Sequence, residues 1–245
     1  MTQGRTARGE LPVNACENCS QRNKTEWCVL KDAEVTLLSQ YKICNTYQAG
    51  QIIFYQGNAC LGVHCVSSGS IVLRKTDAQG NSVVTRVVNA GETLGYRAFF
   101  SGKSYSATAE AVDTCKVCFV DRVAVQTLLE RNPLLGLRFL KKLSDDVLKS
   151  EDILLEIATL PVRVRFAHLL LTFKERLGEM SNNGTWSIRL PLSRQDIASL
   201  LCIRPETLAR TISQLEEDNV AVFKGRDVKI SDLDKLLDEV EHVDV

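Results

Sequence analysis

The stretch from Ser193 to Leu215 constrains the fold of this chain more than any other part. It predicts a helix from 194 to about 201, a three-residue turn, and a second helix that begins at Pro205. Proline suits the first position of a helix because the N–H that it lacks would have no partner there. Residues 220–230 then alternate around Lys224-Gly225-Arg226, which predicts a β-hairpin. Two short helices and a hairpin form a winged helix-turn-helix, a structure that binds DNA.

The second helix of this pair carries residues that suit base recognition. Glu206 and Arg210 are four positions apart and therefore share one face, together with Ser213. Arginine can donate two hydrogen bonds to guanine, and glutamate can accept one from cytosine. The alternative is a solvent-exposed ion pair on a surface helix. Residues at the flanking loops suit contacts to DNA phosphates: Ser193, Arg194, Lys224 and Arg226.

The region from about 45 to 120 has a different pattern. Short β-branched runs are broken by Gly, Asn and Asp about every 8–12 residues, which is typical of an all-β barrel or roll. The residues Asp77-Ala-Gln-Gly-Asn predict a hairpin loop within it. The chain has 245 residues, which suits one large domain or two modest ones.

A heptad pattern links these two regions and runs to Pro161. Its spacing of three and four predicts a long helix whose seam pairs with a second copy of the chain, so that the protein is a homodimer. The alternative is a helix packed on its own domain. The seam has one polar position, which weakens association and fixes the register. The predicted seam residues are Leu140, Leu143, Val147, Ser150, Leu154 and Ile157.

These patterns predict an α+β protein in four parts. They are a Cys-rich N-terminal segment (residues 1–30), a β-roll sensor domain (residues 31–125), a dimerisation helix (residues 126–160) and a winged helix-turn-helix domain (residues 161–245). In the last part, a helix is expected over Val162–Leu177, a polar loop over Met180–Thr185 and a strand from Trp186 to Leu190.

Composition excludes several other classes of protein. The apolar fraction is 44% and the net charge is zero, as in an ordinary globular protein. No apolar run approaches the roughly 18–20 residues of a membrane helix, and the N-terminus is too polar for a signal peptide. We therefore expect a cytoplasmic protein with no membrane partner. Nothing resembles a catalytic triad, a P-loop or a glycine-rich dinucleotide turn, so no enzyme is implied.

Nine cysteines are many for a cytoplasmic chain and indicate metal or redox chemistry. Cys16-Glu-Asn-Cys19 is a CxxC motif, and Cys28 follows it. Zinc sites, iron–sulfur sites and dithiol redox sites all use such a motif, so a CxxC redox enzyme or electron carrier is an alternative of a different class. Three thiolates need a fourth ligand, for which the candidates are Cys44, Cys60, Cys65, Cys115, Cys118 and Cys202. Free cysteines are commonly small buried hydrophobes, which is our interpretation of Cys44, Cys60, Cys65 and Cys202.

Two motifs resemble the CRP/FNR family of transcription regulators, and the resemblance covers nearly the whole chain. Glu206-Thr-Leu-Ala-Arg210 is similar to the Glu-Thr-x-x-Arg recognition helix of that family. Gly95-Tyr-Arg-Ala-Phe-Phe-Ser-Gly-Lys-Ser-Tyr-Ser-Ala-Thr-Ala-Glu-Ala resembles the FNR form of the central loop of the β-roll. One departure is Cys202, which stands in the turn where the family usually has glycine. If that turn needs a positive φ, the cysteine is strained there.

The resemblance implies a ligand set and a mechanism. FNR-type sensors take three ligands near the N-terminus and one from a strand before the dimer helix, which implies a [4Fe-4S] cluster on Cys16, Cys19, Cys28 and Cys118. Cys115 is the nearest competitor for the fourth position. The intact cluster would favour a dimer on a palindromic TTG-like site, and oxygen or nitric oxide would destroy it; RNA polymerase is the implied partner. Structural zinc and a thiol/disulfide switch remain alternatives.

A cyclic-nucleotide effector is a further alternative within the same family. Relatives that bind cyclic AMP use an Arg-Ser pair in the central loop, where the arginine meets the phosphate. Alignment puts Tyr105-Ser106 at that pair. Without the cation a buried phosphate would lack its main partner, so we expect no tight binding of cyclic nucleotides.

Overall fold

A computed structural model describes residues 16–181 and 184–241. The first half of the predicted Cys-rich segment and the last four residues of the chain therefore lie outside the described residues. The chain forms two compact units. One comprises Met1–Ile71 with Val88–Leu143, and the other Val72–Val87 with Ser144–Val245. The division falls at Leu143, inside the segment that we expected to be one dimerisation helix.

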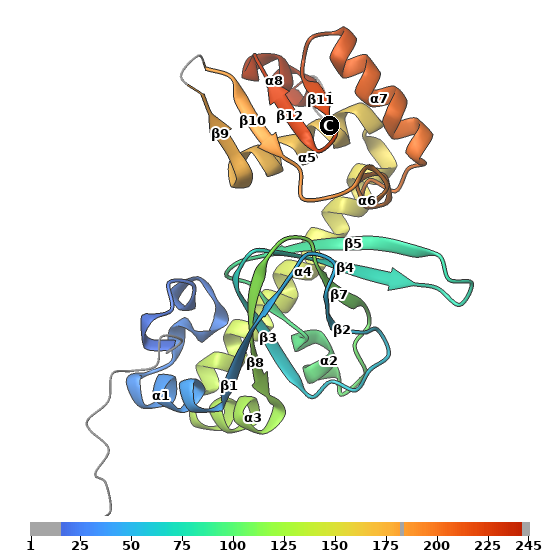
Figure 1. The fold of residues 1–245 in the computed structure, drawn as a ribbon. Helices are drawn as coiled ribbons and strands as arrows, with labels where there is room; N and C mark the ends of the chain where they lie inside the picture. The colour runs from blue at the N-terminus through green and yellow to red at the C-terminus, as the bar shows by residue number, and fades with distance from the viewer. Residues whose placement is uncertain (1–15, 182–183, 242–245) are drawn as a thin grey trace, which may run out of the picture. The chain divides into compact units, whose positions relative to one another are not determined.

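The predicted β-roll is confirmed and consists of two antiparallel-paired four-stranded sheets (Figure 1). The first has the order β1 (Lys42–Tyr47), β8 (Cys115–Asp121), β3 (Gly62–Ser68) and β6 (Thr93–Leu94). The second has the order β2 (Ile52–Phe54), β7 (Thr108–Ala111), β4 (Ser70–Thr76) and β5 (Ser82–Asn89). A short helix, α2 (Tyr96–Ser101), follows Gly95, whose φ of 80° suits a residue without a side chain.

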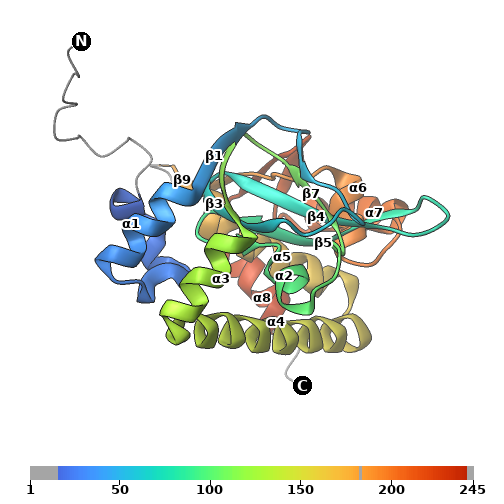
Figure 2. The ribbon, with the colours of Figure 1, turned by 90° about the horizontal axis from the view of Figure 1, so that it is seen from below.

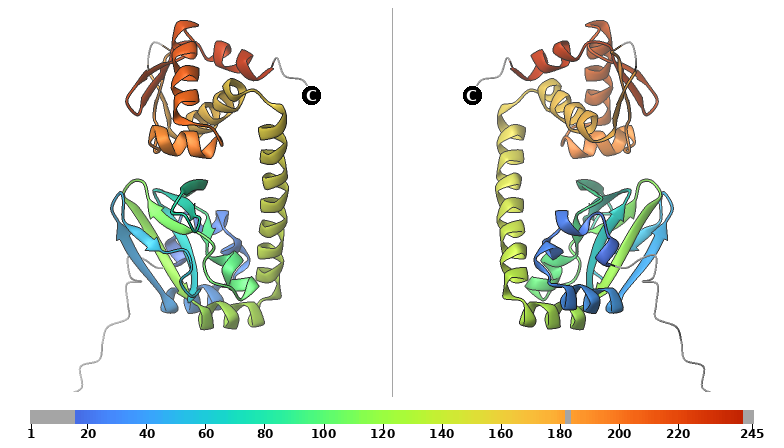
Figure 3. Two further views of the ribbon diagram at one scale, coloured as in Figure 1. Left: turned by 90° about the vertical axis from the view of Figure 1, so that its right-hand side faces the viewer. Right: turned by 90° about the vertical axis from the view of Figure 1, so that its left-hand side faces the viewer.

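Helices and short 3-10 turns adjoin the first sheet. The N-terminal turns are η1 (Cys16–Asn18), η2 (Arg22–Lys24) and η3 (Glu26–Val29), and α1 (Asp32–Tyr41) follows them. Figure 2 shows these turns beside α1, and α3 (Arg122–Arg131) leading into α4 (Pro133–Thr159). The Asp121 side chain accepts a hydrogen bond from the backbone N–H of Ala124, which caps α3. Figure 3 shows α4 as one uninterrupted helix, as the heptad pattern predicts.

The C-terminal region is a winged helix-turn-helix. Its helices are α5 (Val162–Leu177), α6 (Arg194–Leu200), α7 (Pro205–Glu217) and α8 (Leu233–Glu241), and the first three begin where the sequence predicts. The strands β9 (Gly178–Met180), β10 (Trp186–Arg189), β11 (Val222–Lys224) and β12 (Asp227–Ile230) form a sheet of order β11-β12-β10-β9. Strand β9 and helix α8 were not predicted. No helix among the described residues has the length and apolar character needed to cross a membrane.

Candidate functional site

The first helix of the DNA-binding motif begins with a complete capping box. The Ser193 hydroxyl accepts a hydrogen bond from the backbone N–H of Asp196 at 3.1 Å, and the Asp196 carboxylate accepts one from the Ser193 backbone at 3.3 Å. The Ser193 hydroxyl also donates to that carboxylate at 2.7 Å. Ser193 therefore fixes the start of α6, and this use competes with the phosphate contact that the sequence predicts for it.

The turn between α6 and α7 depends on a left-handed residue. Cys202 has a φ of 55°, so the turn takes a positive φ at this cysteine and the expected strain is present. The buried Arg165 side chain supports the same turn by donating to the carbonyl of Leu201 at 2.5 Å. The sequence did not predict this role of Arg165, because the two residues are 36 positions apart.

The second helix has one buried face and one exposed face. Leu208 and Leu215 are fully buried against the rest of the unit, which holds α7 in place. Glu206, Arg210 and Ser213 are all exposed on the other side of the helix. Their exposure leaves the predicted base-reading side chains available to a ligand.

Two arginines that are predicted from the sequence to contact DNA phosphates hold the wing in place. Arg194 donates to the carbonyl of Gly225 at 3.3 Å, and its guanidinium lies 5.1 Å from the centre of the Phe223 ring. Partial burial lowers the pKa of Arg194, and the nearby Glu216 opposes that effect. Arg226 donates to the carbonyl of Pro191 at 3.5 Å. Arg194 and Arg226 thus position the wing.

At the tip of the wing, Lys224 is exposed and Gly225 adopts a φ of 64°. This glycine allows the tight turn that the sequence predicts at this place. Lys224 thus lies at the surface, where the predicted phosphate contact requires it to be.

The interior of the β-roll is filled by aromatic side chains. The rings of Phe54 and Tyr105 are stacked with centres 4.0 Å apart, and His64 lies 4.9 Å from Phe119. The Tyr105 hydroxyl donates to the carbonyl of Gly62 at 3.2 Å, and burial raises its pKa. Burial also lowers the pKa of His64 to about 4, so it is neutral near pH 7. At the position aligned with the phosphate-binding arginine, the roll therefore offers a buried tyrosine.

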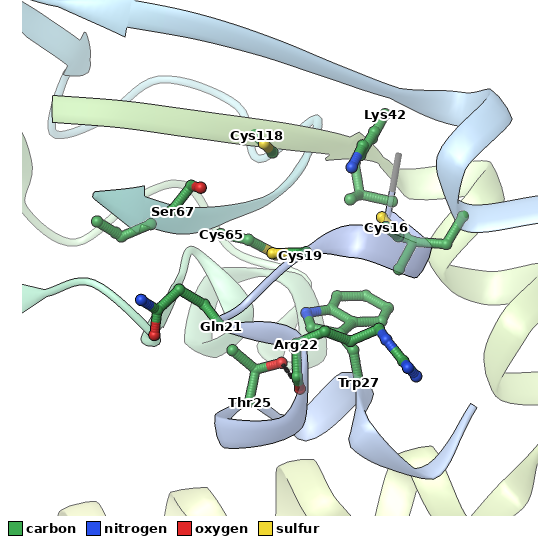
Figure 4. Close-up of a pocket in the computed structure, with 13 residues that line it drawn as sticks. Cys16, Cys19, Gln21, Arg22, Thr25, Trp27, Lys42, Cys65, Ser67 and Cys118 are labelled. Carbon is green, nitrogen blue, oxygen red and sulfur yellow. Dashed lines mark hydrogen bonds between the residues drawn. The ribbon is translucent and has the colours of Figure 1, made fainter. Parts of the chain in front are cut away.

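A pocket lies between the first sheet and the N-terminal turns (Figure 4). Cys118 on β8 and Cys65 on β3 face each other across the two strands. Cys16 and Cys19 line the same pocket from the N-terminal side. Desolvation raises the pKa of the Cys65 thiol to about 12. The pocket therefore brings together three of the four predicted ligands and one cysteine that we expected in the core.

The fourth predicted ligand lies elsewhere, and Cys118 is already bonded. The Cys28 sulfur accepts a hydrogen bond from the Arg138 guanidinium at 3.0 Å, and Cys28 does not line the pocket. Cys118 forms a disulfide with Cys44, its opposite residue on β1. Among the described residues no group of three or more His, Cys, Asp or Glu side chains is arranged to hold a metal ion. In this disulfide-bonded form the four predicted ligands are therefore not gathered at one site.

The other cysteines test the interpretation of free thiols as buried hydrophobes. It is confirmed for Cys60, which is buried and donates from sulfur to the carbonyl of Gly62 at 3.3 Å. It is wrong for Cys202, which is exposed because the left-handed turn directs it to solvent. It is also wrong for Cys44, because the pairing of β1 with β8 places that thiol against Cys118.

Comparisons with known proteins agree with this architecture. The sequence model for the cyclic nucleotide-binding domain matches residues 44–132, and that for the Crp-like helix-turn-helix domain matches residues 164–239. The chain is 27% identical to the transcriptional activator protein FnrL of Cereibacter sphaeroides over 94% of each chain. It is 24% identical to the fumarate and nitrate reduction regulatory protein of Escherichia coli K12, over 80% of this chain and 77% of that protein.

The chain belongs to the CRP/FNR family of DNA-binding transcription regulators. The solved structure of FixK2 from Bradyrhizobium japonicum has the same fold, with a TM-score of 0.69 and 22% identity over 80% of this chain and 96% of that one.

In this CRP/FNR protein the N-terminal turns are packed firmly on the start of α4. Trp27 is 2% exposed, and its ring meets that of Phe139 edge-on with centres 5.7 Å apart. The side-chain amide of Asn132 donates to the carbonyl of Val29 at 3.0 Å. These long-range contacts give the N-terminal turns their ordered structure. The sequence of the segment has no periodic apolar pattern from which that structure could be predicted.

The exposed face of α4 partly matches the seam that the heptads predict. Leu140, Val147 and Leu154 are 59%, 58% and 66% exposed, as unpaired seam residues of a single chain would be. Leu143 and Ile157 are only half-buried, so they lie at the margin of that face. Ser150 is exposed, and its hydroxyl donates to the carbonyl of Asp146 at 2.7 Å. Other apolar residues of α4 are also exposed, on other sides of the helix: Leu134, Leu137, Leu148, Ile153 and Leu155.

Proposed function

We propose that this CRP/FNR regulator senses oxygen, nitric oxide or redox state through its cysteines, and that the signal controls binding to DNA. The observation that carries the proposal is the pocket that Cys16, Cys19 and Cys118 line together. Cysteines from distant parts of the sequence gather there beside the turns that pack on α4. A chemical change at the pocket therefore acts on residues that contact the helix of the proposed dimer seam. No enzymatic step is part of the proposal.

DNA binding would use the exposed face of α7 in the major groove. Arg210 and Glu206 would read a G·C pair of a TTG-like half-site, with Ser213 further along the same face. Lys224 at the wing tip would contact a phosphate, and Ser193, Arg194 and Arg226 lie at the adjoining loops. A homodimer joined along α4 would place two such faces on half-sites about one helical turn apart. RNA polymerase would be the partner at the promoter, in the cytoplasm.

The metal-loaded state would require the pocket in its reduced form. Cys16, Cys19, Cys28 and Cys118 would then supply the four thiolates that a [4Fe-4S] cluster takes from a protein. When bound, such a cluster supplies a centre that reacts with oxygen or nitric oxide. Cys28 would have to leave Arg138, and Cys118 would have to be free of Cys44. Cys118 is favoured over Cys115 as the fourth ligand, because Cys115 is fully buried and does not line the pocket.

Two alternatives use the same cysteines, namely a structural zinc ion and a thiol/disulfide switch without metal. The Cys44–Cys118 bond favours the second of these. A cyclic-nucleotide effector is disfavoured, because Tyr105 stands where a phosphate would need a cation. A CxxC electron carrier would have no use for an exposed recognition helix.

Anaerobic purification followed by a controlled exposure to air tests the proposal. We expect iron and acid-labile sulfide with a visible absorbance in the anaerobic protein, and DNA binding that falls as this absorbance is lost. Sedimentation measured in parallel reports the dimer. A protein that stays dimeric and DNA-bound after the absorbance has gone would show that the cluster is not the switch.

A further inference from the structure

Three cysteines form a row across the first sheet. Cys44 on the edge strand β1 is opposite Cys118 on β8, and Cys118 is in turn opposite Cys65 on β3. Residues that face each other on neighbouring antiparallel strands bring their side chains close together. Cys118 is therefore flanked by a thiol on each side, and the structure joins it to Cys44.

The two partners of this disulfide differ in access to solvent. Cys118 is 9% exposed, whereas Cys44 is half-buried on a strand at the edge of the sheet. A small thiol or disulfide in solution therefore reaches Cys44 more readily than Cys118. Cys118 also lines the pocket that holds Cys16 and Cys19, so the bond affects the pocket directly.

We propose that Cys44 is the disulfide partner that captures Cys118, so that oxidation closes the Cys44–Cys118 bond and withdraws Cys118 from metal binding. A metal-binding cysteine acts as a thiolate, and a sulfur held in a disulfide is not one. The described structure is then the oxidised, ligand-withdrawn state of the sensor. This inference rests on the proposed function, because it takes Cys118 to be a ligand in the reduced state.

The chemistry balances with a low-molecular-weight disulfide as the oxidant. The Cys44 thiolate attacks one sulfur of that disulfide and releases the other as a thiolate, which leaves a mixed disulfide on Cys44. The Cys118 thiolate then attacks the Cys44 sulfur and releases the second small thiol. Two protein thiols are oxidised and one small disulfide is reduced to two thiols. The same steps in reverse, with an excess of small thiol, free both cysteines.

Disulfide mapping of metal-free protein tests the bond itself. The full-length protein and its Cys44→Ser variant are equilibrated with oxidised or reduced glutathione, alkylated and digested without reduction. We expect mass spectrometry to find the Cys44 and Cys118 peptides joined in the oxidised wild-type protein and separate after reduction. A matched control, Cys202→Ser, alters an exposed cysteine on the other unit and should give the wild-type pattern.

Iron uptake tests the consequence for the pocket. Each protein is treated anaerobically with ferrous iron and sulfide, with and without prior reduction. Oxidised wild-type protein and oxidised Cys202→Ser should bind about tenfold less iron than their reduced forms. Cys44→Ser should bind the same amount in both states, because its Cys118 cannot be captured by residue 44. Thermal melts of the variants confirm that they are folded.

The outcomes separate the two proposals. A Cys65–Cys118 pair in place of the Cys44–Cys118 pair, or oxidised wild-type protein that binds as much iron as the reduced form, would overturn the role of Cys44 and leave the cluster proposal standing. A mapped Cys44–Cys118 bond in a protein that binds no iron in any state would overturn the cluster proposal and, with it, the withdrawal of a ligand.

Discussion

The Lys142 ammonium on α4 lies 3.4 Å from the carboxylate of Glu26 in the N-terminal turns. The two side chains are 15% and 9% exposed, so the pair is largely shielded from water. Glu26 also accepts a hydrogen bond from the Thr93 hydroxyl at 2.6 Å, and Lys142 lies 5.4 Å from the centre of the Tyr96 ring. This ion pair connects the cysteine-bearing turns to the helix that carries the proposed dimer seam.

Removal of one partner should therefore cost stability. In Lys142→Met the Glu26 carboxylate stays buried without its cation, and we expect the free energy of unfolding to fall by about 3–5 kcal/mol. Adding Glu26→Gln should recover part of this loss, because the buried charge is then gone. Urea unfolding followed by the fluorescence of the buried Trp27 measures the effect. Lys103→Met, an exposed lysine on the same unit, is the control and should change stability by about 0.5 kcal/mol or less.

Stability in acid should depend on His64. Its pKa is about 4 in the folded protein because of burial, and its Nδ1 atom has no hydrogen-bond partner among the described residues. In the unfolded chain the pKa is about 6.5, so the unfolded state takes up the proton first and gains stability as the pH falls. Between pH 6.5 and 4 this single residue should cost the native state about 3 kcal/mol.

The His64→Phe variant isolates this contribution. Its ring suits the aromatic surroundings of Phe54 and Phe119 and cannot be protonated. The stability of the variant relative to the wild-type protein should be constant above pH 7 and should rise by about 3 kcal/mol towards pH 4. A difference that does not change with pH would mean that His64 is already accessible to water in the folded state.

The sequence predicted the elements whose signals are local. Helix α5 occupies Val162–Leu177 as expected, because an apolar period and Pro161 define it. Helix α7 begins at Pro205 as predicted, because proline suits the first position of a helix. Strand β9 was missed, because its three residues Gly178–Met180 pair with β10 and carry no alternation of their own.

The cysteine site was less predictable, because it depends on strand register. Nothing local indicates that Cys44 is opposite Cys118, since the two are 74 residues apart and meet only when β1 pairs with β8. The contacts of the side chains at the wing could not be predicted for the same reason. Arginine is a residue type that commonly binds phosphate, but the hydrogen bond from Arg194 to the carbonyl of Gly225 depends on the folded wing. The shared exposed face of Glu206, Arg210 and Ser213 on α7 was easier to predict, because it follows from helical spacing alone.

The strained turn of the helix-turn-helix yields a stabilising substitution. Cys202 has a φ of 55°, which costs a residue with a side chain roughly 1 kcal/mol relative to glycine. Because the thiol is exposed, Cys202→Gly loses little packing. We expect the melting temperature of the C-terminal unit to rise, by an amount that corresponds to about 1 kcal/mol. Cys202→Ala keeps the strained φ and should show no such gain.

Base recognition and phosphate binding should separate on mutation. Arg210→Ala should lose about 1–3 kcal/mol of binding to a TTG-like site and relax the preference at the G·C pair. Lys224→Ala should weaken binding to all sequences alike and reduce the salt dependence by about one phosphate contact. Both side chains are exposed, so neither change should alter the fold. If Arg210→Ala kept the full sequence preference, Glu206 and Arg210 would be an ordinary surface ion pair.

The exposed apolar face of α4 gives the last prediction. Leu154 is 66% exposed in the single chain, and in the proposed homodimer its side chain would be buried against the partner copy. Leu154→Glu removes that apolar area from both copies and places two like charges near each other. Since burial of one leucine contributes about 1.5–3 kcal/mol, the two copies together should lose about 3–6 kcal/mol of association free energy.

Sedimentation of the anaerobic protein measures this loss against a matched control. Val123 on α3 is 70% exposed and lies outside the predicted seam, so Val123→Glu adds the same charge at another exposed apolar position. We expect Leu154→Glu to be monomeric at concentrations where the wild-type protein and Val123→Glu are dimeric. Because the two copies of the proposed dimer would each read one half-site, Leu154→Glu should also lose its affinity for a palindromic site while retaining weak binding to a single half-site. Equal dimerisation by all three proteins would place the interface on another surface.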